Sequence, residues 1–148
     1  MRGAVGTWSF GPFDNDTAAD FAADLDETPE SGRLDKLHDA LLAVSGCVGH
    51  VDGPRAEVAV AAAALAARDL AGGEEFQPQH YGPVNQIPSV PKDLITVAAG
   101  VVDCIIDGDN DVKDYWNGTG DSEKWLAALK RLRKVLAGDP SGAMDPLW

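Results

Sequence analysis

The stretch Val58-Ala-Val-Ala-Ala-Ala-Ala-Leu-Ala-Ala67 decides the expected fold, because it is apolar on every face of a helix and consists mostly of alanine. A helix that is apolar all round is buried, and its small side chains let neighbouring helices approach closely. Asp52 is placed to cap this helix, and Pro54 suits an early helical position. The pattern predicts a central helix from Pro54 to about Leu70, with other helices packed around it.

The segments around this centre carry apolar residues at alternating three- and four-residue spacing, which indicates amphipathic helices. We therefore predict an all-α fold, a compact bundle of five to six helices in a single domain over residues 1–148, preceded by an extended anchor segment at 1–13. A long loop at 74–91 and a loose tail at 138–148 complete the prediction. The further expected helices run from Asp16 to Asp26, from the cap Ser31 to Val48, from Pro91 to Ile106, from Val112 to Trp116, and from the cap Asp121 to Leu136.

The charge of the chain limits its partners. The 148 residues carry a net charge of −12 and a sequence pI near 4.4, so the surface repels phosphate backbones and anionic lipids. We expect no nucleic acid partner and no membrane partner, while a basic protein partner fits this charge. The alternative is that the charge only keeps the protein soluble. Without a basic, apolar leader or an apolar run of about 18 residues, the expected location is the cytoplasm.

The stretch from Trp8 to Phe21 reads as an anchor that leads into the first helix. Asp14, Asn15 and Asp16 can each cap that helix, and Asp20 lies on its polar face. The preferred interpretation is a set of caps followed by a solvated face, and the alternative is a carboxylate cluster that binds a cation or a polar ligand. Trp8 is interpreted first as part of the core and second as a contact surface.

The sequence of this stretch, Trp-Ser-Phe-Gly-Pro-Phe-Asp-Asn-Asp-Thr-Ala-Ala-Asp-Phe, closely resembles the opening of the bacterial domain-of-unknown-function family 4259. The blocks at 59–65, 81–83 and 121–136 also look like later parts of that family. Ser9 departs from the glycine that the family has after the tryptophan. Because the family has no established activity, the resemblance implies no functional residues for this chain.

The long segment at 74–91 concentrates polar side chains between four prolines and contains the adjacent pair His80 and Tyr81. Long ordered loops in compact domains are often functional, so this segment is a candidate ligand site. The preferred interpretation is nevertheless a proline-stiffened crossover between helices, because the histidine has no obvious partner for acid-base chemistry.

Asp107, Asp109 and Asp111 match the first three ligand positions of an EF-hand loop. The match then fails, because the sixth position is Val112 instead of glycine and the twelfth is Gly118 instead of glutamate. We predict a turn that ends one helix and caps the next. No metal is expected, and if one bound, these three aspartates would be its ligands.

Two cysteines, Cys47 and Cys104, lie in apolar helical contexts and are expected to be buried free thiols. The sequence Cys47-Val-Gly-His50 resembles half of a zinc site. No second pair completes it, so the structural interpretation is preferred.

Five basic residues crowd the last predicted helix, which could lie against the acidic first helix and give the domain opposed charged faces. No catalytic residues and no cofactor are predicted, and the protein is more consistent with a non-enzyme. The preferred hypothesis is a small interaction module, immunity-like or antitoxin-like, that masks a basic partner protein. The alternatives are a metal-dependent enzyme or metal-binding protein that uses the aspartates, and a small-ligand binder at 74–91.

Overall fold

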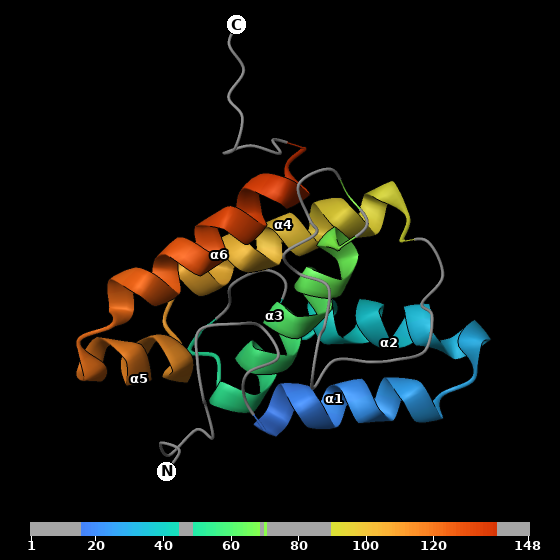
Figure 1. Cartoon of the computed structure of the whole chain (residues 1–148), viewed down its shortest axis with the longest axis horizontal. Helices are drawn as coiled ribbons and strands as arrows, with labels where there is room; N and C mark the ends of the chain where they lie inside the picture. The colour runs from blue at the N-terminus through green and yellow to red at the C-terminus, as the bar shows by residue number, and fades with distance from the viewer. Residues whose placement is uncertain (1–15, 45–48, 69, 71–89, 139–148) are drawn as a thin grey trace, which may run out of the picture.

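A computed structural model of the chain describes residues 16–44, 49–68, 70 and 90–138. These residues form an all-α fold, as predicted, and one buried apolar cluster draws on all of its helices. The order of the helices is shown in Figure 1: α1 (Asp16–Glu27), α2 (Glu30–Leu42), α3 (Gly53–Ala67), α4 (Lys92–Asp107), α5 (Asp111–Thr119) and α6 (Ser122–Leu136).

Helix α3 is the centre of the bundle, as its alanine-rich sequence predicts. Every residue from Ala61 to Ala67 is buried. Helices α1 and α2 pack on one side of α3, whereas α4 and α6 pack on the other side (Figure 1). The alanine side chain is a single methyl group, so the surrounding helices can approach α3 closely.

The apolar stripes of α4 and α6 are buried as predicted. The buried residues include Ile105 on α4 and Trp125 on α6. The expectation that the last helix lies against the first is wrong, because α6 packs against α3, α4 and α5. Burying the apolar stripe of α6 against other apolar stripes removes more apolar surface from water than a contact between two charged faces would.

Of the predicted caps Asp52, Ser31 and Asp121, only Asp52 accepts the capping hydrogen bond with its side chain. Asp52 caps α3, with its carboxylate accepting a hydrogen bond from the Arg55 N–H at 3.2 Å. Ser31 lies inside α2, which begins one residue after Pro29, because the Pro29 carbonyl already accepts the Gly32 N–H at 2.8 Å. Asp121 precedes α6 without a capping hydrogen bond from its side chain.

The ends of the helices differ from prediction by several residues. Helix α2 ends at Leu42 instead of Val48, although Val44 beyond it is still buried in the core. Helix α5 extends to Thr119, where Gly120 follows with a φ of 86°. This left-handed conformation commonly follows the end of a helix, and glycine adopts it without steric strain.

The expectation of a free thiol at Cys104 is wrong, because this half-buried cysteine is disulfide-bonded. The anchor segment at 1–13, the loop positions 74–89 and the tail at 139–148 lie outside the described residues. Within the described part of the chain, no helix is both long enough and apolar enough for a membrane span.

Candidate functional site

Two segments far apart in the sequence meet at the start of α3. Val51 and Asn110 form a parallel β-bridge. The Val51 N–H donates to the Asp109 carbonyl oxygen at 3.0 Å, and the Asp111 N–H donates to the Val51 carbonyl oxygen at 3.0 Å. We call this place the 50–111 junction, and it consists of His50, Val51, Asp109, Asn110 and Asp111.

Asn110 anchors the junction in the core. Its side chain is 1% exposed, and its amide nitrogen donates to the Ile105 carbonyl oxygen at 3.0 Å. Its Oδ1 accepts the Lys113 N–H at 2.8 Å, which caps α5. The predicted helix-ending and helix-capping turn is therefore confirmed here, with Asn110 as the cap.

Lys113 neutralises the end of α4. Its ammonium group donates to the Ile106 carbonyl oxygen at 2.8 Å and to the Gly108 carbonyl oxygen at 3.2 Å. A cation at this place interacts favourably with the negative end of the helix dipole. The ammonium is thus directed at backbone carbonyls and not at the aspartates beside it.

His50 lies between two carboxylates on the outer side of the junction. Its Nε2 is 2.6 Å from Asp111 Oδ1, and its Nδ1 is 3.1 Å from Asp109 Oδ2. The Gly53 N–H donates to Asp111 Oδ2 at 3.0 Å and fixes that carboxylate. The hydrogen bonds to Asp111 and then to Asp109 raise the pKa of His50 above 6.5. The hydrogen bonds from His50 and then from Gly53 lower the pKa of Asp111 below 3.8.

His50, Asp111 and Asp114 bring potential ligand atoms within 4.8 Å of one another, but all three are exposed. Acidic side chains gather at helix N-termini without an ion, because the helix dipole favours them there. Asp107, the last residue of α4, does not belong to this group. Asp109 and Asp111 hold His50, so the described geometry is that of an ion pair and not of an EF-hand.

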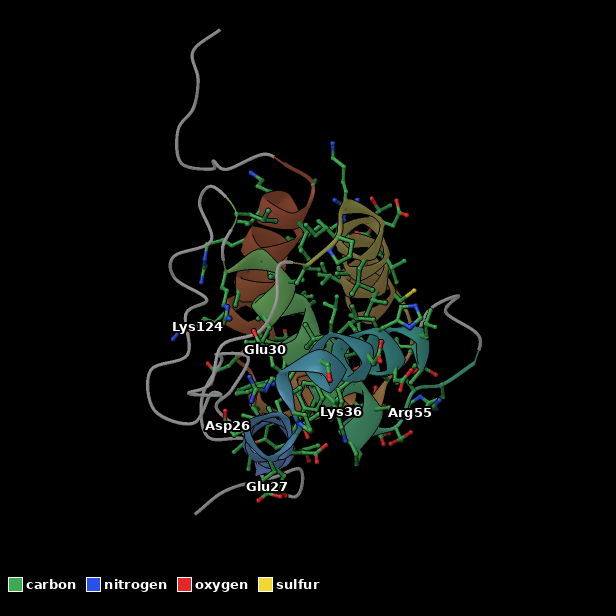
Figure 2. The ribbon with its side chains drawn as sticks, turned by 90° about the vertical axis from the view of Figure 1, so that its right-hand side faces the viewer. Asp26, Glu27, Glu30, Lys36, Arg55 and Lys124 are labelled. Carbon is green, nitrogen blue, oxygen red and sulfur yellow. The ribbon has the colours of Figure 1, made fainter. Side chains whose placement is uncertain are left out.

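The side of the bundle formed by α1 and α2 is strongly acidic. Residues 16–42 contain eight acidic and two basic side chains. The two basic groups are engaged, since Lys36 pairs with Asp24 at 2.8 Å and Arg33 Nε donates to the carbonyls of Leu25 and Thr28. Figure 2 looks onto the turn between α1 and α2, with Asp26, Glu27 and Glu30 around it. We call the exposed acidic residues of these helices the acidic α1–α2 face: Asp20, Asp24, Glu27, Glu30, Asp35 and Asp39.

Helix α6 carries the opposite charge on the other side of α3 (Figure 1). Its residues 122–136 contain five basic side chains and one acidic side chain. Arg133 pairs with Asp103 of α4 at 2.8 Å, so part of this basic charge is balanced next to α6. The acidic α1–α2 face and the basic helix α6 therefore lie on opposite sides of the central helix.

The structure places few of the predicted site residues. Asp20 is exposed on α1, and Asp16 begins that helix, although its side chain lies outside the description. The remaining predicted site residues, Trp8, Asp14, Asn15, His80 and Tyr81, also lie outside the described residues. Sequence reasoning missed the partnership of His50 with Asp109 and Asp111, because no local spacing connects residues about sixty positions apart.

Comparison with known proteins assigns most of the chain to one family. Residues 6–128 match the family model described as "Domain of unknown function (DUF4259)". Neither the curated proteins nor the solved structures contain a significant match. The match covers well over half of the chain and agrees with the resemblance of the opening stretch.

Proposed function

The chain belongs to the DUF4259 family, and we propose that it acts as a small acidic interaction module whose acidic α1–α2 face binds a basic partner protein. The observation that carries this proposal is the excess of acidic charge on α1 and α2: eight acidic and two basic side chains lie in residues 16–42, across the central helix from the basic α6. An immunity-like or antitoxin-like role fits a surface of this kind.

The exposed carboxylates of this face have little local neutralisation. Lys36 pairs with Asp24, while Asp20, Asp35 and Asp39 are exposed and have no basic partner among the interactions of the described residues. A surface that concentrates one sign of charge attracts partners of the opposite sign and accelerates their association. The same charge argues against nucleic acid or an anionic membrane as the partner.

Charge alone does not distinguish a specific face from a generally acidic protein, so the experiment compares two variants of equal net charge. The face variant combines Asp20→Asn, Asp35→Asn and Asp39→Asn. The control variant combines Asp93→Asn, Asp107→Asn and Glu123→Gln, which are exposed on other elements. Each variant removes three negative charges.

Proteins captured from the native cytosol by the wild-type chain are identified, and their affinity is then measured by titration calorimetry with both variants. We expect the face variant to bind about tenfold more weakly, from three exposed charge contacts of roughly 0.5 kcal/mol each, and the control variant to bind as the wild type does. Binding should also weaken steeply between about 0.05 and 0.5 M salt, because exposed charges are screened over roughly 10 Å at 0.1 M. Equal losses in both variants, or binding independent of salt, would contradict the proposal.

The cytoplasm is our proposed location, and cell fractionation tests it. The redox state of Cys104 is measured in the same samples, because disulfide bonds are rare in that compartment. Thiols are alkylated in intact cells before fractionation. Recovery of the chain in the cytosolic fraction supports the proposed location, and recovery in an extracytoplasmic fraction contradicts it.

A further inference from the structure

We propose that His50 is a proton-operated latch: the protonated ring holds the segment before α3 to the turn between α4 and α5, and loss of the proton releases the 50–111 junction. This regulatory device is independent of the acidic α1–α2 face, because it uses different residues, His50, Asp109 and Asp111.

The hydrogen-bonding capacity of the His50 ring differs between its two protonation states. Both nitrogens of His50 face carboxylate oxygens, Nε2 at 2.6 Å from Asp111 and Nδ1 at 3.1 Å from Asp109. An ionised carboxylate can only accept hydrogen bonds, and a neutral imidazole has one N–H to donate. Only the imidazolium ion can therefore make both contacts at once. After deprotonation one ring nitrogen presents a lone pair to a carboxylate oxygen.

Protonated His50 is the main cation that offsets the negative charge of the surrounding carboxylates. Asp109, Asp111 and Asp114 surround the ring on the side of α5. On the side of α3, the Asp52 carboxylate pairs with Arg55. The ammonium of Lys113, the nearest base in the α5 sequence, is directed at the carbonyls of Ile106 and Gly108. Loss of the proton thus leaves the carboxylates of the junction facing one another without a cation between them.

The remaining connections at this place are few. Two backbone hydrogen bonds join Val51 to Asp109 and Asp111, and a third bond runs from the Gly53 N–H to Asp111. Asp109 and Asp111 are exposed, and so is His50, with 41% of its side chain accessible. Val51 is buried in the core, but the bonds on the outer side of the junction are polar and join exposed residues, and such bonds can open locally while the core stays folded. The buried Asn110 keeps α5 attached at its start, so the opening is confined to the outer part of the junction.

The test follows the imidazole signals and the amide hydrogen exchange of the full chain by NMR between pH 5 and 9, in chelator-treated samples. Protection factors at Val51 and Asp111 are divided by that of Leu65 in α3, which corrects for changes in global stability. We expect the relative protection to fall as pH rises through the pKa of His50, and we expect this pKa to lie above 6.5. In His50→Gln the relative protection should not change with pH in this range. The matched control His38→Gln, an exposed position on α2, should keep the wild-type pH profile.

A second variant keeps the proposal testable if His50→Gln disturbs folding. Asp109→Asn leaves the contact with Asp111 in place, so it should lower the pKa of His50 toward 6.5 and shift the loss of protection to lower pH. Protection that does not change with pH, or that changes equally in His50→Gln, would overturn the latch. A fall in protection on chelator treatment at constant pH would also overturn it, because a bound cation would then hold the junction in place of a proton.

Discussion

Helix α3 and the 50–111 junction both fix the positions of other helices, but they do so by opposite means. Helix α3 buries a continuous alanine surface from Ala61 to Ala67. The junction instead joins its segments through hydrogen bonds and an exposed ion pair between His50 and Asp111. Apolar burial has no titratable group and is little affected by moderate salt, whereas an exposed ion pair depends on both pH and salt. The architecture is therefore fixed by α3, and its response to the environment is concentrated at the junction.

The largest expected effect is at the core. Leu65 is 2% exposed, so Leu65→Ala should lower the free energy of unfolding by about 2–5 kcal/mol through lost burial and a new cavity. The control is Leu42→Ala, which removes a side chain that is 47% exposed and should change stability by less than about 0.5 kcal/mol. Chemical denaturation at several pH values measures both. If the loss of unfolding free energy in Leu65→Ala varied with pH, the distinction between a pH-independent core and a pH-dependent junction would be wrong.

Asn110→Ala tests the buried polar residue of the junction. The substitution removes the α5 cap, which is worth about 1 kcal/mol, and leaves the buried Ile105 carbonyl without its side-chain donor, at a further cost of about 1–3 kcal/mol. Asn117→Ala on the exposed part of α5 is the control and should be close to neutral. Equal effects of the two substitutions, measured by thermal unfolding, would show that Asn110 does not anchor the junction.

Gly108 tests how closely the chain folds back on α4. A Cβ atom at this position would lie 2.6 Å from the Cys104 carbonyl oxygen, so Gly108→Ala should cost about 1–3 kcal/mol through a forced backbone shift. Gly118→Ala in α5 meets no atom within 4 Å and should instead stabilise the helix by up to about 1 kcal/mol. Urea denaturation measures whether each substitution lowers or raises the free energy of unfolding. A stabilising Gly108→Ala would contradict the described turn.

The smallest effect is expected from the pH dependence of the ion pair, which is read as the difference in melting temperature between wild type and His50→Gln. The pKa of His50 is raised in the folded state, so its stabilisation is present below pH 6.5 and is lost as pH rises through the folded pKa. The pKa of Asp111 is lowered, so its contribution is present above pH 3.8 and is lost as pH falls through its folded pKa. The difference should be largest between these limits. A difference that is constant from pH 4 to 9 would exclude the ion pair as its source.

The fold could be predicted from the sequence because its determinants are local and periodic. The alanine run at 58–67 predicted a buried central helix, and the stripe that includes Trp125 predicted the buried face of α6. Helix ends were predicted less well, since Ser31 and Asp121 have capping side chains but neither accepts the capping hydrogen bond. Whether a cap forms depends on the conformation of the preceding turn, which Pro29 sets at the start of α2.

The candidate site was predicted only in part. The aspartates at 107–111 were recognised as the turn between two helices, which is local information. The pairing of His50 with this turn is a product of the docking of α3 against α4 and α5, so it could not be read from either segment alone. The disulfide bond of Cys104 was also missed. Its apolar context is typical of a free thiol, so the neighbouring residues carried no signal for the bond.

The parallel bridge at Val51 and Asn110 also has a consequence for the order of folding. The bonds of the junction join residues 58 and 61 positions apart, a loop closure that would be costly if the junction formed first. Docking of α3 against α4 closes the same loop, so the junction can then form without that entropic penalty. We therefore expect φ-values near zero for His50 and Asp111: substitutions there should speed unfolding and leave the refolding rate unchanged.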